Sequence, residues 1–311
     1  MPGIKFKSKT LLAKIEGTYG VDAAPTGAAN AVLALNVEIS PMEGQDVARD
    51  LERPTLSADP MIPVGVHAVL SFDVELVGSG TLGTAPAWGP LMRMCGVAQT
   101  VTAGVKVEYA PITGNEESGS IYFMIGNTRH VMLGTRGTFA ITTNANGIPV
   151  KRYTMTGLFT IPTEEATVTP DFTAWQQPQV ATKLNTPTFT IGGAAFILRD
   201  FSMDLGNDVQ PRMLIGSETI EIVDRAETIR ARVEAVPVST YNPFTIAQNQ
   251  TLQAIQLIHG TVASKRVKID VPTAQQKRLT GYEEAQGILE WPLEFTPLPT
   301  AGNDQWKITL S

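Results

Sequence analysis

ELVGSGTLGTAPAWGPLMR, residues 75–93, joins a strand-like run to a helix-like run through three glycines. Gly78, Gly80 and Gly83 fit G-x-G-x-x-G, and Glu108 ends the next strand-like run, as in dinucleotide-binding folds. The strand-like run before the glycines alternates polar and apolar residues, whereas a central parallel strand is apolar on both faces. The helix is short for a crossover, and no further strand–helix alternation follows. We therefore expect a strand-to-helix turn here, without a nicotinamide, flavin or other cofactor.

The run before the glycines, VHAVLSFDVELV (66–77), has a period of two residues. This pattern predicts an antiparallel strand with one buried and one polar face. The predicted buried face holds Leu70, Phe72, Val74 and Leu76, and the polar face holds Ser71, Asp73 and Glu75.

The composition is that of a globular, mildly acidic protein. The 311 residues include 17% charged residues, a net charge of −6 and a single cysteine, Cys95. One cysteine excludes an internal disulfide and a multi-cysteine metal site. The lack of a Lys/Arg block disfavours tight binding to nucleic-acid phosphates. No hydrolase, zincin or phosphate-loop motif is present, and no apolar run has the roughly 18 residues of a membrane span.

Turn residues divide the sequence into two β-rich parts. Gly126-Asn127 and Asn146-Gly147 each lie between strand-like runs and predict hairpins. Residues 41–65 are rich in proline and charge and are predicted to form a long loop. Helices are expected over residues 85–96 and 244–260. The predicted organisation is an N-terminal arm (1–30), a first β domain (31–161), a Pro-rich linker (162–187) and a second β domain (188–311).

The two β-rich parts repeat one order of elements. LNVEIS (35–40), a strand, a helix led by proline and VKVEYAP (105–111) follow one another in the first part. FSMDLG (201–206), a strand, a helix led by proline and VKIDVP (267–272) follow one another in the second. A recurring order of elements at a nearly constant offset indicates an internal duplication.

The duplication also bears on the glycines. At the place of GSGTLGTAP the second part has AVPVSTYNPF (235–244), which contains no glycine, and Gly260 aligns with Gly96. We therefore expect both parts to make the same strand-to-helix corner, whether glycine is present or not.

Four segments resemble the major tail tube proteins of long, non-contractile-tailed bacteriophages (siphophages). They are GTAPAWGPLMRMCG (83–96), TRHVMLGTRGTFAI (128–141), MTGLFTIPT (155–163) and SMDLGNDVQPRMLIGSETIEIVDR (202–225). The resemblance implies a mainly β fold of two tandem tail-tube-like β-sandwich or barrel domains, each with one flanking α-helix. It also implies a structural protein of the virion tail, assembled in the bacterial cytoplasm, and not an enzyme.

The resemblance further implies a ring-forming subunit. Six tube folds form a ring in this family, and stacked rings enclose a channel for DNA delivery. The implied partners are further copies of the chain, the tail terminator, tape measure and distal tail proteins, and genomic DNA in transit, without a membrane. Because one chain with two folds supplies two of six positions, we expect trimeric, pseudo-sixfold rings in place of hexamers.

Candidate working residues lie on two elements. The predicted loop 41–65 offers a mixed-charge run for contacts between rings, with solvation as the alternative. Its charged residues are Glu43, Asp46, Arg49, Asp50, Glu52 and Arg53. Asp73 and Glu75 are candidate lumen-facing acids, although the matching strand of the second part is partly basic, with Arg230 and Arg232.

A β-sandwich binding or decorating virion protein that builds no tube is the alternative function. Such a module would present aromatic residues on exposed loops. The four tryptophans lie in a predicted helix, in the linker and in two closing strands, which favours packing in the core. They are Trp88, Trp175, Trp291 and Trp306.

Overall fold

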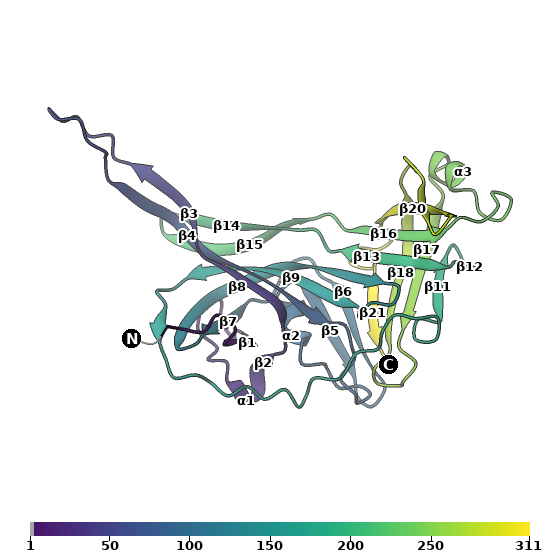
Figure 1. The fold of residues 1–311 in the computed structure, drawn as a ribbon, viewed down its shortest axis with the longest axis horizontal. Coiled ribbons are helices and arrows are strands. Elements are labelled where there is room, and N and C mark those ends of the chain that lie inside the picture. Colours follow the sequence, from purple (N-terminus) through teal and green to yellow (C-terminus); the bar gives the residue numbers. More distant parts are fainter. Residues whose placement is uncertain (1–2) are drawn as a thin grey trace.

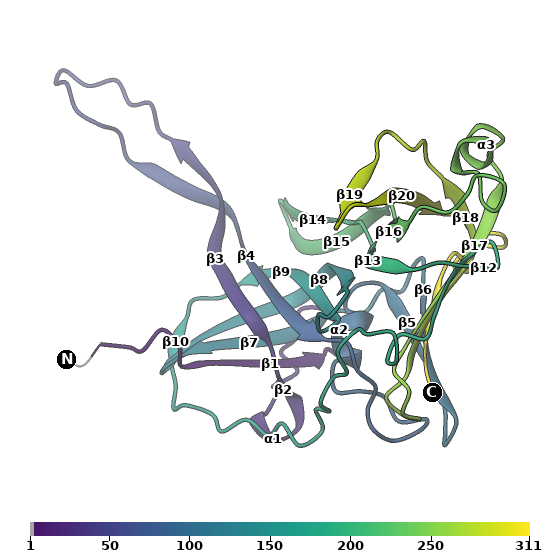
Figure 2. The ribbon, with the colours of Figure 1, turned by 45° about the vertical axis from the view of Figure 1, so that its right-hand side comes forward.

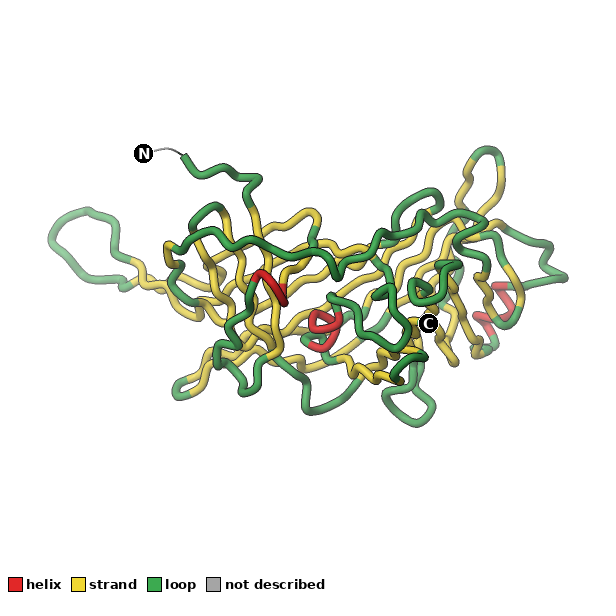
Figure 3. The backbone as a smooth tube through the Cα atoms, turned by 90° about the horizontal axis from the view of Figure 1, so that it is seen from below, coloured by secondary structure: helices red, strands yellow, loops and turns green. Residues whose placement is uncertain are grey.

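The structure, a computed structural model, describes residues 3–311 as an antiparallel β protein with three short helices (Figure 1, Figure 3). The helices are α1 (Gly27–Asn30), α2 (Gly89–Arg93) and α3 (Pro243–Gln248). The strands of the N-terminal half are β1 (Lys9–Ile15), β2 (Ala31–Val32), β3 (Leu35–Ala48), β4 (Met61–Glu75), β5 (Val97–Thr102), β6 (Lys106–Pro111), β7 (Gly119–Ile125), β8 (Thr128–Asn144), β9 (Val150–Phe159) and β10 (Thr163–Glu164). The strands of the C-terminal half are β11 (Thr188–Ile191), β12 (Ala194–Ala195), β13 (Leu198–Asp204), β14 (Asn207–Leu214), β15 (Ser217–Arg225), β16 (Thr228–Glu234), β17 (Leu252–His259), β18 (Val267–Gln276), β19 (Glu283–Ala285), β20 (Ile288–Pro297) and β21 (Lys307–Leu310).

One sheet runs without a break through both halves. Its order is β3-β4-β9-β8-β13-β16-β20, with β19 at the far end. Residues 140–144 of β8 pair with residues 200–204 of β13 and join the halves. Directly opposed residues of antiparallel strands point to the same face, so the register defines rows across six strands. One row is fully buried: Val74, Lys151, Ile141, Met203, Ile229 and Phe295.

The second layer is also shared between the halves. Its order is β5-β6-β21-β18-β17-β11-β12, so the last strand, β21, lies between β6 and β18. β2, β1 and β7 complete the N-terminal half, and β7 pairs with the first part of β8. Phe139 of β8 meets Trp306 edge-on, with ring centroids 6.3 Å apart. The two halves therefore share one hydrophobic core.

The sequence pattern predicted several of these elements correctly. Leu70, Phe72 and Val74 of β4 are fully buried, as their alternation indicates. The β7–β8 turn at Gly126 (φ 59°) and the β8–β9 turn at Asn146 (φ 62°) both use the left-handed backbone that tight hairpins need. The tryptophans also pack as expected: Trp88, Trp291 and Trp306 are buried, and Trp175 is half-buried.

Two sequence-based expectations are wrong. The predicted loop 41–65 is mostly strand, because β3 ends at Ala48 and β4 begins at Met61. Its prolines are tolerated because each arm strand has one neighbour there, so a missing N–H disrupts no second pairing. The predicted helix 244–260 ends at Gln248, and residues 252–259 form β17, with every second side chain turned inward. Within the predicted N-terminal arm, residues 9–15 form β1, which pairs with β7 along its full length.

Residues 165–187 contain no helix or strand and follow the surface of the N-terminal half, below it in Figure 1. Trp175 Nε1 donates a hydrogen bond to the Ala31 carbonyl at 3.0 Å, and Asp171 N donates to the Gly27 carbonyl at 2.9 Å. Gly27 has no room for a side chain, since a Cβ there would lie 2.4 Å from Val168. The Pro-rich segment is therefore an irregular strap held at fixed points.

The glycines of residues 75–93 serve close packing. A Cβ at Gly78 would lie 2.3 Å from the Ser264 carbonyl of the C-terminal half. Gly83 has a φ of 64°, and a Cβ added to it would lie 2.2 Å from the nitrogen of Gly104, which belongs to the β5–β6 turn. Helix α2 begins only at Gly89 and has five residues, and the preceding strand lies in an antiparallel sheet. This arrangement lacks the βαβ unit of a dinucleotide site.

The core contains a buried lysine. Lys151 is fully buried between Val74 and Ile141, and its Nζ lies 2.9 Å from the centroid of the Trp88 ring. Within residues 3–311 this nitrogen has no hydrogen-bond partner. Burial disfavours the charged ammonium, so the pKa of Lys151 lies well below its usual value. The fold therefore carries the cost of an unpaired amine in its core.

We expect Lys151→Met to raise the free energy of unfolding by roughly 1–3 kcal/mol at pH 7, since an unpaired polar group leaves the core. The pKa of Lys151 is lower in the folded chain than in the unfolded chain, where it is about 10.4, so the unfolded chain binds more protons and the wild type gains stability as pH rises to that value. Urea denaturation of the unassembled subunits at pH 7 and pH 10 measures both effects. An advantage of Met that is equal at the two pH values would contradict the proton-linked explanation.

Candidate assembly surfaces

The β3–β4 arm, residues 40–67, projects from the body of the protein (Figure 1, Figure 2). Its strands pair with each other at Val47 and Ile62 and at Ala48 and Met61, and residues 49–60 close the tip. In the part of the chain that the structure describes, β3 pairs with β4 alone. Its second edge is therefore open, and an open edge is a template for pairing with another chain.

The arm exposes an unusual amount of apolar surface. Val47, Ile62 and Val64 share one face, because Val47 opposes Ile62 and Val64 lies two residues further along the same strand. A contiguous apolar face on a projecting element indicates a protein-binding surface. The exposed large apolar residues of the arm are Met42, Val47, Leu51, Leu56, Met61, Ile62 and Val64.

All six candidate inter-ring residues lie on this arm. Glu43 and Asp46 belong to β3, where both side chains are exposed. The other four lie at the tip: Arg49, Asp50, Glu52 and Arg53. Arg53 forms an ion pair with Asp59 across the tip at 3.5 Å. The sequence placed all six charged residues in one loop, whereas the structure places two on strand β3 and four at the tip of the hairpin.

A second hairpin, the β14–β15 arm (residues 207–225), lies against the N-terminal half and contacts β8, β9 and β4 (Figure 1). Ile220 is fully buried in this contact. Its N–H donates to Tyr19 Oη at 2.6 Å, and its carbonyl accepts from Arg136 at 2.8 Å. Arg136 also forms an ion pair with Glu221. This hairpin is the docked arm. The β3–β4 arm, the free arm, contacts the docked arm at its base, near Gly65 and Met213, and projects beyond it.

Asn207 fixes the point where the docked arm leaves the sheet. Its Nδ2 donates to the carbonyls of Cys95 and Gly137 at 2.8 and 2.9 Å, and its Oδ1 accepts from Arg225 at 2.8 Å. Arg225 continues the network to the Gly96 carbonyl at 2.9 Å. Sequence analysis missed this residue, although the alternation on either side of Ile215-Gly216 signals a hairpin.

The polar face of the continuous sheet is the second candidate surface. One row of this face crosses both halves: Glu75, Val150, Thr142, Ser202, Arg230 and Glu294. Asp73 lies on the same face but is largely buried, and it accepts a hydrogen bond from Asn36 at 2.7 Å. Glu75 is half-buried, and desolvation raises its pKa. Both acids therefore point away from the core, as their alternation indicates.

The basic residues that complicate this face are neutralised by carboxylates. Arg230 pairs with Glu294 at 3.1 Å, and Arg232 pairs with the fully buried Glu290. Arg152 lies 3.6 Å from Asp73. A guanidinium already engaged by a carboxylate offers less attraction to a phosphate. The partly basic pattern in the sequence therefore does not make this face a phosphate-binding surface.

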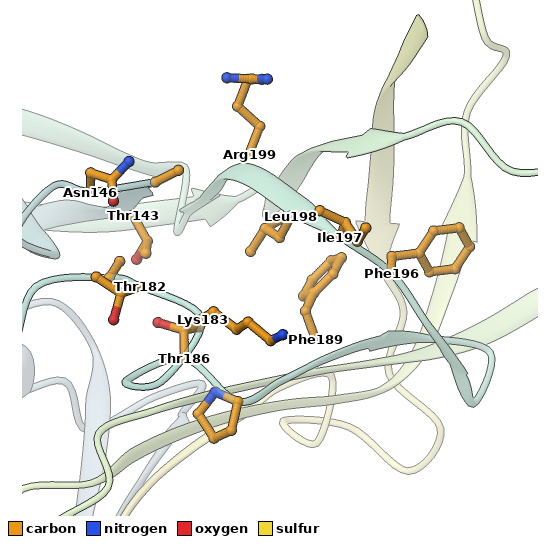
Figure 4. A pocket seen from close by; sticks show the side chains of 13 residues that line it. Thr143, Asn146, Thr182, Lys183, Thr186, Phe189, Phe196, Ile197, Leu198 and Arg199 are labelled. Atoms are coloured by element: carbon orange, nitrogen blue, oxygen red, sulfur yellow. The ribbon is translucent and has the colours of Figure 1, made fainter. Parts of the chain in front are cut away.

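A pocket of about 440 Å³ lies where the two halves and the linker meet (Figure 4). Phe189 and Leu198 form apolar walls, and Thr182, Lys183 and Thr186 come from the linker side. No carboxylate or histidine lines it, so it lacks an acid–base pair for catalysis. Within residues 3–311 there is also no metal-binding cluster of His, Cys, Asp and Glu, and no helix fit to span a membrane.

Open sheet edges and an exposed apolar arm are typical of a β protein that associates with other chains. The chain belongs to the phage tail tube protein family, whose model it matches over residues 7–304. A comparison with curated proteins gave no match. Family membership makes this chain a non-enzymatic subunit of the virion tail that assembles with itself into a tube.

We expect Asn207→Ala to cost about 1–3 kcal/mol of unfolding free energy, because two buried carbonyls and Arg225 each lose a partner. Hydrogen exchange should rise first in residues 207–225, where the arm loosens. Gln210→Ala is the matched control, since Gln210 is exposed on the same strand and bonds only to Asp208. Equal protection of the arm in both variants would contradict the anchoring role of Asn207.

Proposed function

We propose that three copies of this chain form each ring of the tail tube of a long, non-contractile-tailed bacteriophage (siphophage). Each copy contributes two tail-tube-like β units, residues 31–161 together with β1, and residues 188–311. The observation that carries the proposal is the sheet that passes from β3 to β20 through both halves, because it already joins two units side by side. Six such units close a ring when three chains join head to tail.

The order of elements supports the two-unit interpretation. A long hairpin, a short helix led by proline and two strands occur as β3, β4, α2, β5 and β6 in the N-terminal unit. The C-terminal unit has β13 with β14, β15 with β16, then α3, β17 and β18. Both helices contain proline in their first turn. Each is followed within three residues by a residue with positive φ: Gly96 (68°) after α2 and Gln250 (54°) after α3. Gln250, not Gly260, is therefore the counterpart of Gly96.

The open edges support closure by the same contact that joins the halves. β13 joins the N-terminal unit by pairing with β8. In the N-terminal unit β3 corresponds to β13 of the C-terminal unit. The edge of β3 that does not pair with β4 is open. At the other end of the sheet, β19 pairs with β20 alone among the described residues. We propose that β3 of one copy pairs with β19 of the next, which leaves no open edge in the closed sheet.

The polar face supplies the channel wall in this arrangement. Asp73 and Glu75 face the lumen with Thr142 and Ser202, while the arginines of the face remain paired with carboxylates. A wall of hydroxyls, acids and neutralised bases gives DNA phosphates no tight contact, so the genome passes without being held. Genomic DNA is thus a transient partner, and no cofactor takes part.

The other proposed contacts are those between stacked rings and those at the two ends of the tube. We propose that the tip of the β3–β4 arm, with Arg49, Asp50, Glu52 and Arg53, contacts the next ring. The tail terminator and distal tail proteins then cap the two ends of the stack, and the tape measure protein occupies the lumen before DNA does. A binding or decorating role without tube assembly is disfavoured by family membership and by the buried tryptophans.

Electron microscopy of the purified protein and of native tails is expected to show stacked rings with a central channel. Class averages should contain three chains per ring with pseudo-sixfold features, since each chain supplies two units. The mass per ring, measured independently, checks the count. Rings of six chains would overturn the trimer, and protein that never forms rings or tubes would overturn the proposed function.

We expect Glu75→Lys to create salt-sensitive DNA binding in assembled tubes, because each ring gains unpaired positive charge on its wall. Retention of short duplex DNA by tubes at 50 mM and 200 mM salt measures the effect. Glu164→Lys makes the same charge change at an exposed position of β10, which pairs with residues 128 and 129 of β8, far along that strand from Thr142, and it should bind no DNA in the lumen. Equal behaviour of the two variants would argue against a lumen lined by this face.

A further inference from the structure

The two arms are built to the same register. In the free arm Glu43 opposes His67, and Gln45 opposes Val64, so the returning strand has one extra residue between these pairs. In the docked arm Asn207 opposes Arg225, and Val209 opposes Ile222, with one extra residue at the same place. A shared β-bulge aligns the arms residue by residue. The aligned pairs are Glu43 with Asn207, Val47 with Pro211, Ile62 with Ile220, and Val64 with Ile222.

This alignment shows what the free arm lacks. Ile220 is fully buried against the N-terminal half, whereas its counterpart Ile62 is 50% exposed. The apolar face of the free arm thus matches the face by which the docked arm is held. Burial of Val47, Ile62 and Val64 against a partner would contribute favourable hydrophobic free energy to association.

The C-terminal half contains an open counterpart of the docking site. In the C-terminal half Gln276 opposes Phe295 of β20, and in the N-terminal half Gly137 opposes Met155 of β9. These two pairs are equivalent, so Lys277, the residue after Gln276, corresponds to Thr138. Gln250 holds the place of Gly96 after the helix. These residues line a groove of about 560 Å³. Its lining includes Gln250, Gln276, Lys277, Arg278, Glu294 and Thr296.

We propose that the β3–β4 arm docks across the C-terminal half of a neighbouring copy of this chain, with Glu43 in the groove beside Lys277 and Arg278. The inference rests on the proposed ring function and identifies the partner surface within it. The docked arm demonstrates the geometry inside one chain, and the free arm repeats it between chains.

Charge supports this occupant. In the docked arm the main-chain N–H of Asn207 donates a hydrogen bond to Thr138 Oγ1 at 3.2 Å. In the proposed contact an acid, Glu43, replaces Asn207, and a base, Lys277, replaces Thr138. The stem of the arm, residues 35–48, carries Glu38, Glu43 and Asp46 and no lysine or arginine. Lys277 already pairs with Glu294 of the same groove, whereas Arg278 is exposed and forms no ion pair among residues 3–311. The acidic stem and the unpaired Arg278 of the groove have complementary charges, which favours this pairing.

Cysteine cross-linking of the full chain tests the proposal. Glu43→Cys with Lys277→Cys places two exposed thiols together only if arms dock between copies, because a disulfide requires Cα atoms about 4.4–6.8 Å apart. The native Cys95 is buried and desolvation raises its pKa, so it stays unreactive. Glu43→Cys with Val262→Cys is the matched control, since Val262 is exposed on the β17–β18 loop, away from the groove.

Mild oxidation of assembled tubes is expected to give covalent dimers and trimers for the Glu43–Lys277 pair, and at least tenfold less product for the control pair. A ladder that ends at the trimer supports closed rings of three chains. Normal tubes without an interchain cross-link at this pair overturn the docking and leave the proposed function intact. Failure of the wild-type protein to form rings or tubes by electron microscopy overturns both.

Discussion

The pairing of β8 with β13 is the interaction on which the rest of the structure depends. It carries one sheet across both halves and sets the phase in which Val74 and Phe295 lie in a single buried row. A slip of one residue would turn the inward residues of one half to the polar face. The second layer reinforces this choice, because β21 reaches β6 only when the halves are in register.

The two arms show one local design in two environments. The β14–β15 arm satisfies its apolar face and its bulge within the chain, while the β3–β4 arm leaves both exposed. Prolines in the free arm and charges at its tip limit unspecific edge-to-edge pairing before assembly, as open edges generally require. In the proposed ring the arm of one copy meets the groove of the next, as head-to-tail closure requires.

The charge pairing on the polar face is compatible with its proposed role as the wall of the channel. Arg230 and Arg232 are engaged by Glu294 and Glu290, so their charge is balanced within the wall. The buried Glu290 holds two arginines at once, Arg199 and Arg232. Such pairs contribute little to stability on their own, but they determine what the surface offers to a passing phosphate.

The sequence by itself determined the local features: the alternation of β4, the turns at Gly126 and Asn146, the buried tryptophans and the absence of catalytic motifs. These follow from side-chain period and turn chemistry, which act over a few residues. Tertiary structure alone decided that residues 252–259 form a strand, because a short apolar run fits either period until β11 and β18 flank it. It also decided the burial of Lys151, the anchoring by Asn207 and the exposure of the β3–β4 arm. Each of these depends on which distant segment lies opposite, and pairing across 60 residues leaves no local signal in the chain.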